Sequence, residues 1–579
     1  MMIHGSEGSN PLFDEPSQMK QSRRPMQVTR SLSVLILSSS LIIQAQTPTA
    51  PGQTSTSGQT PSAPPAATIP APVLIQNAQP AGAGVQTSGA PVQTNTPGTV
   101  LNTRPITLQE ALDLALQHNY DVQIQRFLPD IARFTLGGSY GAYDPVLSAS
   151  GQHSYSLSPG GLNPYNQVYL GAETEADSFN TSLSGLLPWG LNYSLIGNAS
   201  DQYGTRPGDL LGARLPFEIT SANAAISQLR QPLLKNFWID AARANISIAK
   251  NRLKYSELTL RLQIMTTVTA VEAAYYNLMF ARENVKVQET ALQLAERLLW
   301  ENRKKVEVGQ MAPLDEKQAE SQAAASRADL ISAQQALDVQ ENVLKNLITD
   351  DYTAWHSLRL VPAENLVALP PLLNLQDSWE KGMRLRPDLL QARLDVQRDD
   401  INVRYSKNQL FPELDLVGQY GYAGSAREFS GALGQISDQN NPYWYYGASV
   451  SYPLGNRSAR NNYKASKATK AQNELILKQK EQNILVQIDN EVKLVQSDFQ
   501  RVDATKAARE FAQDALAAEQ KKLENGKSTN FEVLRLQRDL TTARFAEVQA
   551  LANYNVDLAQ LSLDEGSTLD RHHLTLQVK

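Results

Sequence analysis

The sequence of 579 residues contains no cysteine, and it carries little net charge, with 53 basic and 58 acidic side chains. Without cysteine the chain cannot form disulfides, thiolate zinc sites, cysteine nucleophiles or the acylated N-terminus of a lipoprotein. Balanced charge gives no reason to expect a nucleic acid partner. None of the six histidines stands at metal-ligand spacing from a second ligand, and the pair His572-His573 falls in a C-terminal tail expected at 564–579. Glycine-rich phosphate loops are also missing. The composition therefore supports neither an enzyme nor a bound cofactor or metal.

Long hydrophobic runs are missing as well, and one short run lies near the N-terminus, from Leu32 to Ile43. Basic residues precede this run and Ala45, a small residue suited to a cleavage point, follows it, which is typical of a signal peptide. The alternative is an inner-membrane anchor, but twelve residues are too few to cross about 30 Å of hydrocarbon as a helix. We therefore expect a signal peptide in residues 1–45.

Residues 46–104 consist mostly of Pro, Thr, Ala, Gly, Ser and Gln. Such a segment cannot bury enough apolar surface to offset the entropy lost on ordering, so we expect a disordered tether. No later run approaches the length of a membrane helix. A membrane-embedded part of this chain would consist of strands.

An internal repeat organises the rest of the chain. Residues from Leu108 onward match those from Leu375 onward at an offset of 267 (375 minus 108), and after the first strands the offset falls to 221. The first repeat, expected at 105–349, therefore holds about 46 residues (267 minus 221) that the second, expected at 375–563, lacks. Matched pairs include Asp121 with Asp388, Pro145 with Pro412, Tyr155 with Tyr422, Pro232 with Pro453 and, at an offset of 217, Gly309 with Gly526.

Two long stretches, Leu233 to Val308 and Asn456 to Asn525, contain neither glycine nor proline. Their Ala-rich composition with Glu, Gln, Lys, Arg and Leu favours helix, and a helix of about 67 residues would rise about 100 Å. A glycine then ends each stretch in the tips 306–314 and 523–530, because glycine accepts the positive φ of a helix end. We expect the chain to double back there as an antiparallel helical hairpin.

Shorter helices complete each repeat. Return helices are expected from 314 to 347 and from 530 to 563, and opening helices from 107 to 134 and from 375 to 408, with a kink near Pro129. Opening and return helices stacked end to end would form a second rod beside the long one. The segment 350–374 is expected to link the two repeats. The mixed small, apolar and charged residues of these helices suit antiparallel coiled coils around a hollow cylinder.

Between the helices the periodicity changes to two, which indicates strands. From Leu147 to Leu157 apolar or aromatic residues alternate with serine and glutamine, and the strands expected within 412–454 repeat this pattern. One apolar and one small polar face suit a membrane barrel with a wet lumen, although a soluble sheet packed on a helix alternates in the same way. In a barrel, the cluster Tyr443, Trp444, Tyr445 and Tyr446 would lie in an aromatic girdle at the membrane interface.

In these features the chain resembles the TolC-like outer membrane efflux protein family. The resemblance rests on the segment Ile106 to Leu112, on Arg386-Pro387-Asp388-Leu389, on the proline-leucine strand exits and on the two glycine tips. It implies a homotrimer in which four strands from each chain close a transmembrane β-barrel in the outer membrane of a Gram-negative-type bacterium. The helices would form a long coiled-coil tunnel through the periplasm.

One segment departs from that pattern. The additional residues, expected at 158–220, contain a hairpin around Pro188-Trp189-Gly190. We expect an extracellular extension; the alternative is additional barrel strands.

The resemblance also implies sites. The family narrows its tunnel with acidic residues after the second tip. The corresponding gate positions here are Glu532 and Arg535, with Asp315 at the matching position of the first repeat, and Arg535 departs from the family's second acidic residue. A ring of Glu532 carboxylates would select cations; the alternative is an ordinary Glu-Arg pair on a solvated helix. A periplasmic adaptor would dock on the tips, whose glycines simple turn chemistry also explains. The docking residues are Val308, Gly309, Gln310, Met311, Asn525, Gly526, Lys527, Ser528 and Thr529.

The sequence therefore predicts a mostly α-helical, duplicated channel subunit with membrane β-strands, serving as the passive exit duct of a tripartite efflux or type I secretion system. The energy for export would come from an inner-membrane pump that the adaptor connects to the duct. Two other classes remain open: a periplasmic coiled-coil adaptor and a scaffold without a transport role.

Overall fold

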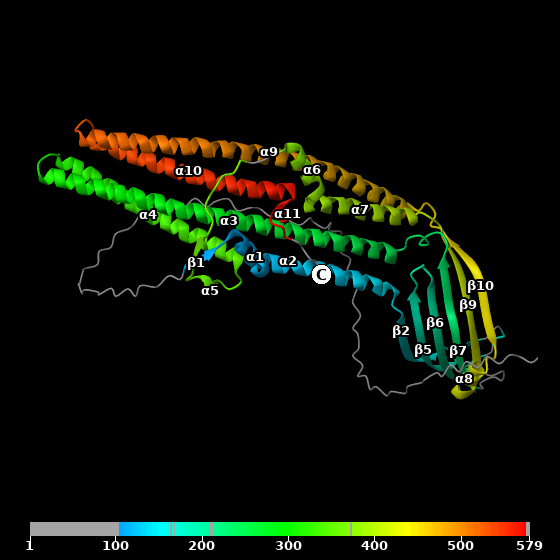
Figure 1. The fold of residues 1–579 in the computed structure, drawn as a ribbon. Coiled ribbons are helices and arrows are strands. Elements are labelled where there is room, and N and C mark those ends of the chain that lie inside the picture. Colours follow the sequence, from blue (N-terminus) through cyan, green and yellow to red (C-terminus); the bar gives the residue numbers. More distant parts are fainter. Residues whose placement is uncertain (1–102, 163–164, 167, 208–213, 371–372, 575–579) are drawn as a thin grey trace, which may run out of the picture. The chain divides into compact units, whose positions relative to one another are not determined.

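The computed structural model describes residues 103–162, 165–166, 168–207, 214–370 and 373–574, which form a bundle of long helices ending in a sheet (Figure 1). The signal peptide expected at 1–45 and nearly all of the tether expected at 46–104 lie outside the described residues. None of the described helices is both long enough and apolar enough to cross a membrane.

Two helical hairpins run side by side along the bundle (Figure 1). In the first hairpin, α3 (Ala241–Glu307, 67 residues) returns as α4 (Pro313–Ile348, 36 residues). In the second, α9 (Arg457–Glu524, 68 residues) returns as α10 (Asn530–Glu565, 36 residues). Asp240 caps the start of α3 by accepting a hydrogen bond from the Arg243 amide at 2.7 Å. The predicted long helices and their half-length returns are confirmed.

Each opening helix is broken into two, where the sequence predicted one. The first repeat has α1 (Leu108–His118) and α2 (Tyr120–Ser139), and the second has α6 (Leu375–Leu385) and α7 (Pro387–Asn408). At the first break the Asn119 side chain caps α2 by accepting from the Asp121 and Val122 amides, while the Asn119 amide closes α1. The sequence did not predict this break, and Pro129, where it predicted a kink, lies inside α2.

The break in the second repeat is held by an arginine. The Arg386 guanidinium binds both carboxylate oxygens of Asp388 at 3.0 Å and donates to the Asp564 carbonyl at 3.3 Å. Pro387 then begins α7, where a missing amide hydrogen costs nothing. The Arg-Pro-Asp motif therefore joins a helix break to the end of α10.

Apolar side chains from the broken helices pack against the long ones in separate clusters. Leu112 and Tyr275 are buried in the first repeat, and Leu389, Ile488 and Tyr554 are buried in the second. A third cluster, around Leu298, Leu516 and Leu534, joins the two hairpins near their tips. Each fully buried leucine stabilises the fold by about 1.5–3 kcal/mol. Tertiary packing therefore holds helices whose mixed surfaces lack one broad apolar face.

Short elements flank the helices near the middle of the bundle. Strand β1 (Thr103–Ile106) pairs in parallel with β8 (Arg359–Pro362), and α5 (Tyr352–Trp355) precedes β8. The expected tether thus extended two residues too far, since Thr103 and Arg104 belong to β1, and the expected linker 350–374 contains regular structure.

The C-terminal segment is packed as far as Leu574. Helix α11 (Thr568–Arg571) buries Leu569 in the core of the first repeat. His572 contacts Glu272, a fully buried carboxylate of α3 that also lies 3.8 Å from Arg571. The tail expected at 564–579 is therefore wrong as far as Leu574, because these residues are packed against the helices. Residues 575–579 lie outside the described chain.

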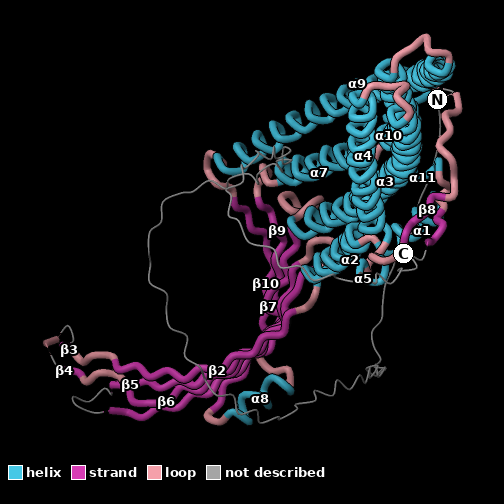
Figure 2. Tube along the Cα trace, turned by 90° about the vertical axis from the view of Figure 1, so that its left-hand side faces the viewer, coloured by secondary structure: helices cyan, strands magenta, loops and turns pink. Residues whose placement is uncertain are grey.

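Six antiparallel strands form one sheet, in the order β10-β9-β7-β6-β5-β2 (Figure 2). The remaining strands, β3 (Gly161–Leu162) and β4 (Val168–Tyr169), pair only with each other. A 3₁₀ turn (Tyr140–Tyr143) leads into the sheet, and α8 (Phe429–Ser437) connects β9 to β10. The six strands are β2 (Val146–Leu157), β5 (Glu173–Leu186), β6 (Asn192–Pro207), β7 (Arg214–Pro232), β9 (Glu413–Ala426) and β10 (Pro442–Ser451).

The additional segment of the first repeat supplies β5 and β6. Both pair along their whole length with neighbours in the sheet, β5 with β2 and β6 with β7. The expectation of an extracellular extension was therefore wrong, and the alternative of additional strands is the one observed. The physical reason is that this segment alternates in the same way as the strands that flank it, so its backbone is satisfied best by pairing with them.

Candidate channel wall and hairpin tips

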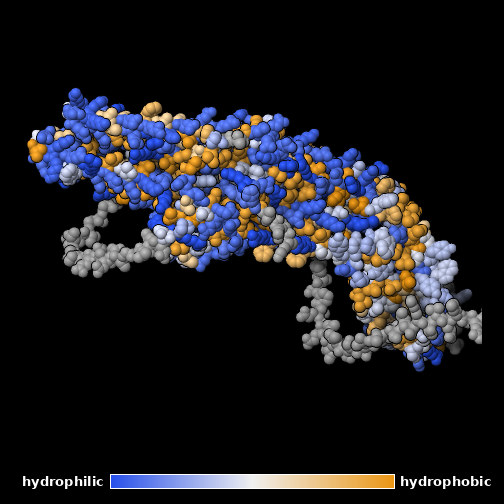
Figure 3. Space-filling view, viewed as in Figure 1, coloured by the Kyte–Doolittle hydropathy of each residue, from blue (hydrophilic) through white to orange (hydrophobic). Residues whose placement is uncertain are grey.

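One face of the sheet is apolar from its helix end to the level of Phe179 and Ala199, beyond which the same face carries His153, Asp177 and Asp201; the other face is polar. At one level of the register the apolar face carries aliphatic and aromatic side chains across all six strands, and hydrophobic residues gather over the strands in Figure 3. These side chains are Leu147, Leu183, Leu195, Ile226, Tyr420 and Trp444. Apolar residues on one side and small polar ones on the other are what a sheet between lipid and water requires.

The opposite face, here called the polar face, is uncharged along its middle. The Ser148 and Ser182 hydroxyls lie 2.7 Å apart between β2 and β5, and those of Ser200 and Ser221 lie 2.8 Å apart between β6 and β7. Hydroxyl and amide groups in such rows can hydrogen-bond to water without attracting either sign of ion. The next level of the register holds the row Ser150, Asn180, Asn198 and Asn223.

Strand alternation divides the predicted aromatic girdle between the two faces. Trp444 and Tyr446 share the apolar face, where their rings stack with centroids 5.8 Å apart. Tyr443 lies opposite Gly421 on the polar face, and Tyr445 follows it there. Because successive side chains of a strand point to opposite sides, only Trp444 and Tyr446 remain candidates for an interfacial girdle.

A charged cluster that the sequence did not reveal ends the polar face next to the helices. Arg230 of β7 binds Asp415 of β9 at 2.6 Å and contacts Glu413, whose carboxylate also lies 3.4 Å from Lys235. Asp415 is only 2% exposed. The i, i+2 spacing of Glu413 and Asp415 was a signal that both face the same side, but their partner is 185 residues away in the chain.

The two hairpin tips have the same backbone geometry. Gly309 and Gly526 take φ values of 78° and 66°, in the left-handed region that glycine adopts without strain. The next amide, of Gln310 or Lys527, donates to a carbonyl five residues back at 2.8 Å in both tips. This closure satisfies carbonyls that the last turn of a helix would otherwise leave free.

Apolar side chains are exposed at the tips. Val308 and Leu314 are 68% and 66% exposed at the first tip, and Phe531 is 56% exposed just after the second. The Asn530 amide lies 3.4 Å from the Met311 sulfur, which brings the two tips into contact. The tips thus form one end of the molecule with several uncovered apolar groups. Leu314 and Phe531 were not among the predicted docking residues.

The predicted gate residues are only partly brought together. Arg535 holds the Glu532 carboxylate through Nη2 at 2.7 Å and Nε at 3.0 Å, one turn apart on α10. Asp315 lies in the first turn of α4, and within the described residues it forms no ion pair with Glu532 or Arg535. Within one chain, Glu532 and Arg535 thus form a local ion pair on α10.

A row of buried and half-buried carboxylates between α9 and α10, here called the acid seam, is a second feature that the sequence did not reveal. It consists of Glu491 and Asp498 on α9 and Asp557 and Asp564 on α10. Burial and the neighbouring Asp498 raise the pKa of Asp557 to about 8. Burial, with Asp564 and Asp498 nearby, raises the pKa of Glu491 to about 7. The only cation that pairs with Asp498 in the described chain is Arg501, at 3.4 Å.

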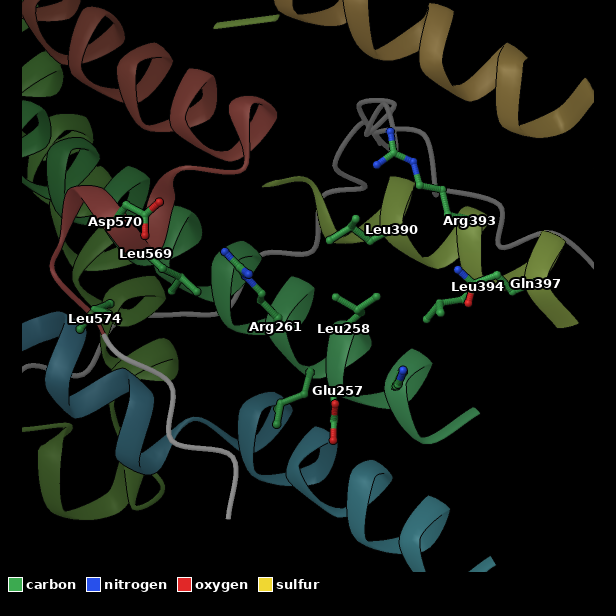
Figure 4. A pocket seen from close by; sticks show the side chains of 12 residues that line it. Glu257, Leu258, Arg261, Leu390, Arg393, Leu394, Gln397, Leu569, Asp570 and Leu574 are labelled. Atoms are coloured by element: carbon green, nitrogen blue, oxygen red, sulfur yellow. The ribbon is translucent and has the colours of Figure 1, made fainter. Parts of the chain in front are cut away.

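A cavity of about 730 Å³ lies between α3, α7 and the C-terminal segment (Figure 4). Leu258, Leu390 and Leu569 contribute an apolar surface, while Arg261 and Arg393 bring positive charge. Among the described residues no group of three or more metal-ligating side chains comes together, at this cavity or elsewhere. The cavity lies where helices of the two repeats meet, and its lining side chains form no recognisable catalytic arrangement.

Comparison with known proteins identifies the family. The outer membrane efflux protein family model matches residues 205–349 and 383–564. Nodulation protein T of Rhizobium leguminosarum bv. trifolii is 24% identical over 186 residues, covering 32% of this chain and 38% of that protein. TolC of Escherichia coli K12 is 23% identical over 443 residues, covering 72% of this chain and 84% of TolC. The match thus spans well under two thirds of nodulation protein T but most of TolC.

A solved structure has the same fold. The Campylobacter jejuni CmeC outer membrane channel superposes with a TM-score of 0.58 at 15% identity, covering 80% of this chain and 86% of CmeC. Strand β5 and most of β6 fall before residue 205, where the family match begins. Because that match extends over more than half of its length, the chain belongs to the outer membrane efflux protein family.

Proposed function

We propose that the chain is the channel subunit of an efflux or secretion system, and that it gives solutes a passive exit through the periplasm and the outer membrane. The observation that carries the proposal is the sheet, whose apolar face is exposed in the single chain and whose opposite face is small and polar. Trp444 and Tyr446 on the apolar face are 65% and 81% exposed, which a soluble protein would rarely leave uncovered.

The active form is a homotrimer in the outer membrane. Within the described chain β2 and β10 each pair on one side only, so that a second copy can add its strand at either edge. In lipid every backbone group must be hydrogen-bonded, which requires the sheet to close on itself. Three copies close both the sheet and the ring of helical rods.

A periplasmic adaptor binds the hairpin tips and connects the duct to an inner-membrane pump. The exposed Val308 and Leu314 supply apolar contacts for such a partner. Replacing Val308 by Asp should abolish export while the trimer remains intact, whereas Val308→Ala should retain most of it. Full export by the Val308→Asp variant would contradict docking at this tip.

Membrane fractionation followed by planar-bilayer recording tests the channel itself. We expect an outer-membrane trimer that dissociates only on heating and that conducts ions. A periplasmic adaptor, the second candidate, would be recovered as a soluble protein without conductance, and that result would overturn the proposal.

A further inference from the structure

The inserted strands β5 and β6 continue both faces of the sheet without a change of phase. Leu183 and Leu195 lie in register with Leu147 on the apolar face. Asn180 and Asn198 lie in register with Ser150 on the polar face. A hairpin folded away from the sheet would have no reason to keep this alternation, since a slip of one residue would exchange its two faces.

The inserted hairpin also runs the full height of the sheet. Its turn is closed by hydrogen bonds between Leu187 and Leu191 and from the Gly190 amide to the Leu187 carbonyl, each 2.8 Å long. A Cβ atom on Gly190 would lie 3.2 Å from Arg243 at the start of α3. The turn therefore sits at the end of the sheet where the long helix begins, and the two strands extend from there to the opposite end.

The position of the hairpin in the sheet decides what it does to the oligomer. It lies between β2 and β7, so it widens the sheet from the inside and leaves the outer edges, β2 and β10, unchanged. Three chains with six strands each give eighteen strands, where four strands each would give twelve. At similar strand tilt the diameter of a barrel grows roughly in proportion to strand number, and barrels of about 16–18 strands enclose an aqueous channel.

We propose that β5 and β6 are part of the channel wall, that they make the exit an eighteen-stranded barrel, and that Asn180, Asn198 and Ser200 line its lumen. The exit then suits large, hydrated solutes, because along the middle of this face the inserted strands add mainly hydroxyl and amide groups, and their one charged residue there, Arg206, lies at the far end of β6. This inference rests on the proposed trimeric channel and extends it to the size and polarity of the cargo that can leave.

Single cysteines can test the wall, because the natural chain has none. Asn198→Cys faces the lumen, and its neighbour Ala199→Cys, on the apolar face, is the matched control. In trimers conducting in planar bilayers, a charged, water-soluble methanethiosulfonate should lower the current of Asn198→Cys in three steps, one per chain. It should leave the current of Ala199→Cys unchanged. Equal responses of the two variants, or no response of Asn198→Cys, would overturn the inference.

Two designed disulfides test the strand order. Ser148→Cys with Ser182→Cys should join β2 to β5, and Ser200→Cys with Ser221→Cys should join β6 to β7, since the native hydroxyls are in contact. Both should form in conducting trimers. If β2 instead paired directly with β7, neither disulfide would form, and the eighteen-stranded wall would be excluded.

Polymer exclusion tests the width. Polyethylene glycols of increasing size, added to one side at a time, should reduce conductance up to a larger size from the barrel side than from the tip side. Equal cut-offs from the two sides would contradict a widened exit. Trimers that never conduct would instead contradict the proposed function, so the two failures can be told apart.

Discussion

The first repeat carries two strands that the second lacks, whereas the second carries a row of buried and half-buried carboxylates, the acid seam, that the first lacks. At the repeat offset of 217, Glu491 and Asp498 correspond to Ala274 and Ala281. The helices that hold these residues, α9 and α3, nevertheless differ by only one residue in length. The scaffold of long helices has therefore kept its dimensions while each copy acquired its own feature.

The differences lie in different parts of the molecule. The strand insertion affects the sheet, where a whole hairpin can be added because each strand needs only a neighbour with matching faces. A hairpin of this kind added to the helical rods would disturb the packing of every neighbouring helix. Substitutions within a helix keep the rod intact, and the acid seam is such a change. The first repeat has thus altered the exit, and the second has altered the interior of its helical hairpin.

The two opening helices are broken in different ways, and substitutions at the two breaks should differ most in their effect on stability. Arg386→Ala removes a side chain that is 13% exposed and leaves Asp388, itself 18% exposed, without its bidentate partner. Loss of one member of a largely buried pair costs about 3 kcal/mol. In the first repeat Asn119→Ala removes a helix cap and a hydrogen bond to the Leu347 carbonyl, at a cost of about 1–2 kcal/mol. Urea unfolding followed by circular dichroism should resolve the difference, and equal losses would contradict it.

Lys480 should reduce the loss of stability that Arg386→Ala causes, and a double variant can measure this. Its ammonium lies 3.5 Å from the second oxygen of Asp388 and would still pair with the carboxylate in the Arg386→Ala variant. Adding Lys480→Ala should therefore destabilise Arg386→Ala by more than it destabilises the native chain. An additive result would place Lys480 outside the network.

The acid seam should make the second hairpin sensitive to pH. Folding raises the pKa values of Glu491 and Asp557 to about 7 and about 8, so these groups stabilise the fold fully below their unfolded pKa values. That stability is lost as the pH rises through the folded values. After allowance for partial exposure, we expect a loss of about 1–2 kcal/mol between about pH 5 and about pH 8, seen as a falling melting temperature.

A variant that gives the second repeat the alanines of the first provides the control. Glu491→Ala with Asp498→Ala places the equivalents of Ala274 and Ala281 in α9 and removes both carboxylates that face Asp557 and Asp564. Its melting temperature should be higher than that of the native protein at pH 8 and should fall less over the same range, because burial still raises the pKa of Asp557. Arg501, already 60% exposed at its side chain, can be solvated without Asp498. A native pH slope in this variant would show that other groups cause it.

Much of this architecture could be predicted from the sequence, and the exceptions have physical causes. Absence of glycine and proline marked α3 and α9, and the two tip glycines marked their ends, because both signals are local. The break at Asn119 was missed since a capping asparagine inside a helical pattern differs little from a solvated one. Strands β5 and β6 were recognised as a hairpin but assigned to the wrong place. Alternation defines the faces of a strand but does not name its neighbours.

The acid seam and the Arg230 cluster could not be predicted for a related reason. Asp498 and Asp557 are 59 positions apart (557 minus 498) and look like ordinary surface charges of two long helices. Only the register of α9 against α10 makes them face each other. The gate pair was easier to foresee, because Glu532 and Arg535 are one turn apart on the same helix and their distance follows from helix geometry.

The smallest effect should come from the tip, where the second repeat carries Arg535 at the position of an uncharged residue of the first. Arg535 corresponds to Gln318 of the first repeat. The variant Arg535→Gln therefore gives both return helices an acidic residue with a glutamine one turn later. The variant frees Glu532 in each of three chains, and we expect the cation-over-anion permeability ratio in planar bilayers to rise roughly twofold to fivefold. Glu532→Gln should shift the ratio the other way, and Gln318→Arg, which places an arginine one turn after Asp315, should also lower it. Unchanged reversal potentials in all three variants would mean that these positions do not line the narrowest part of the tunnel.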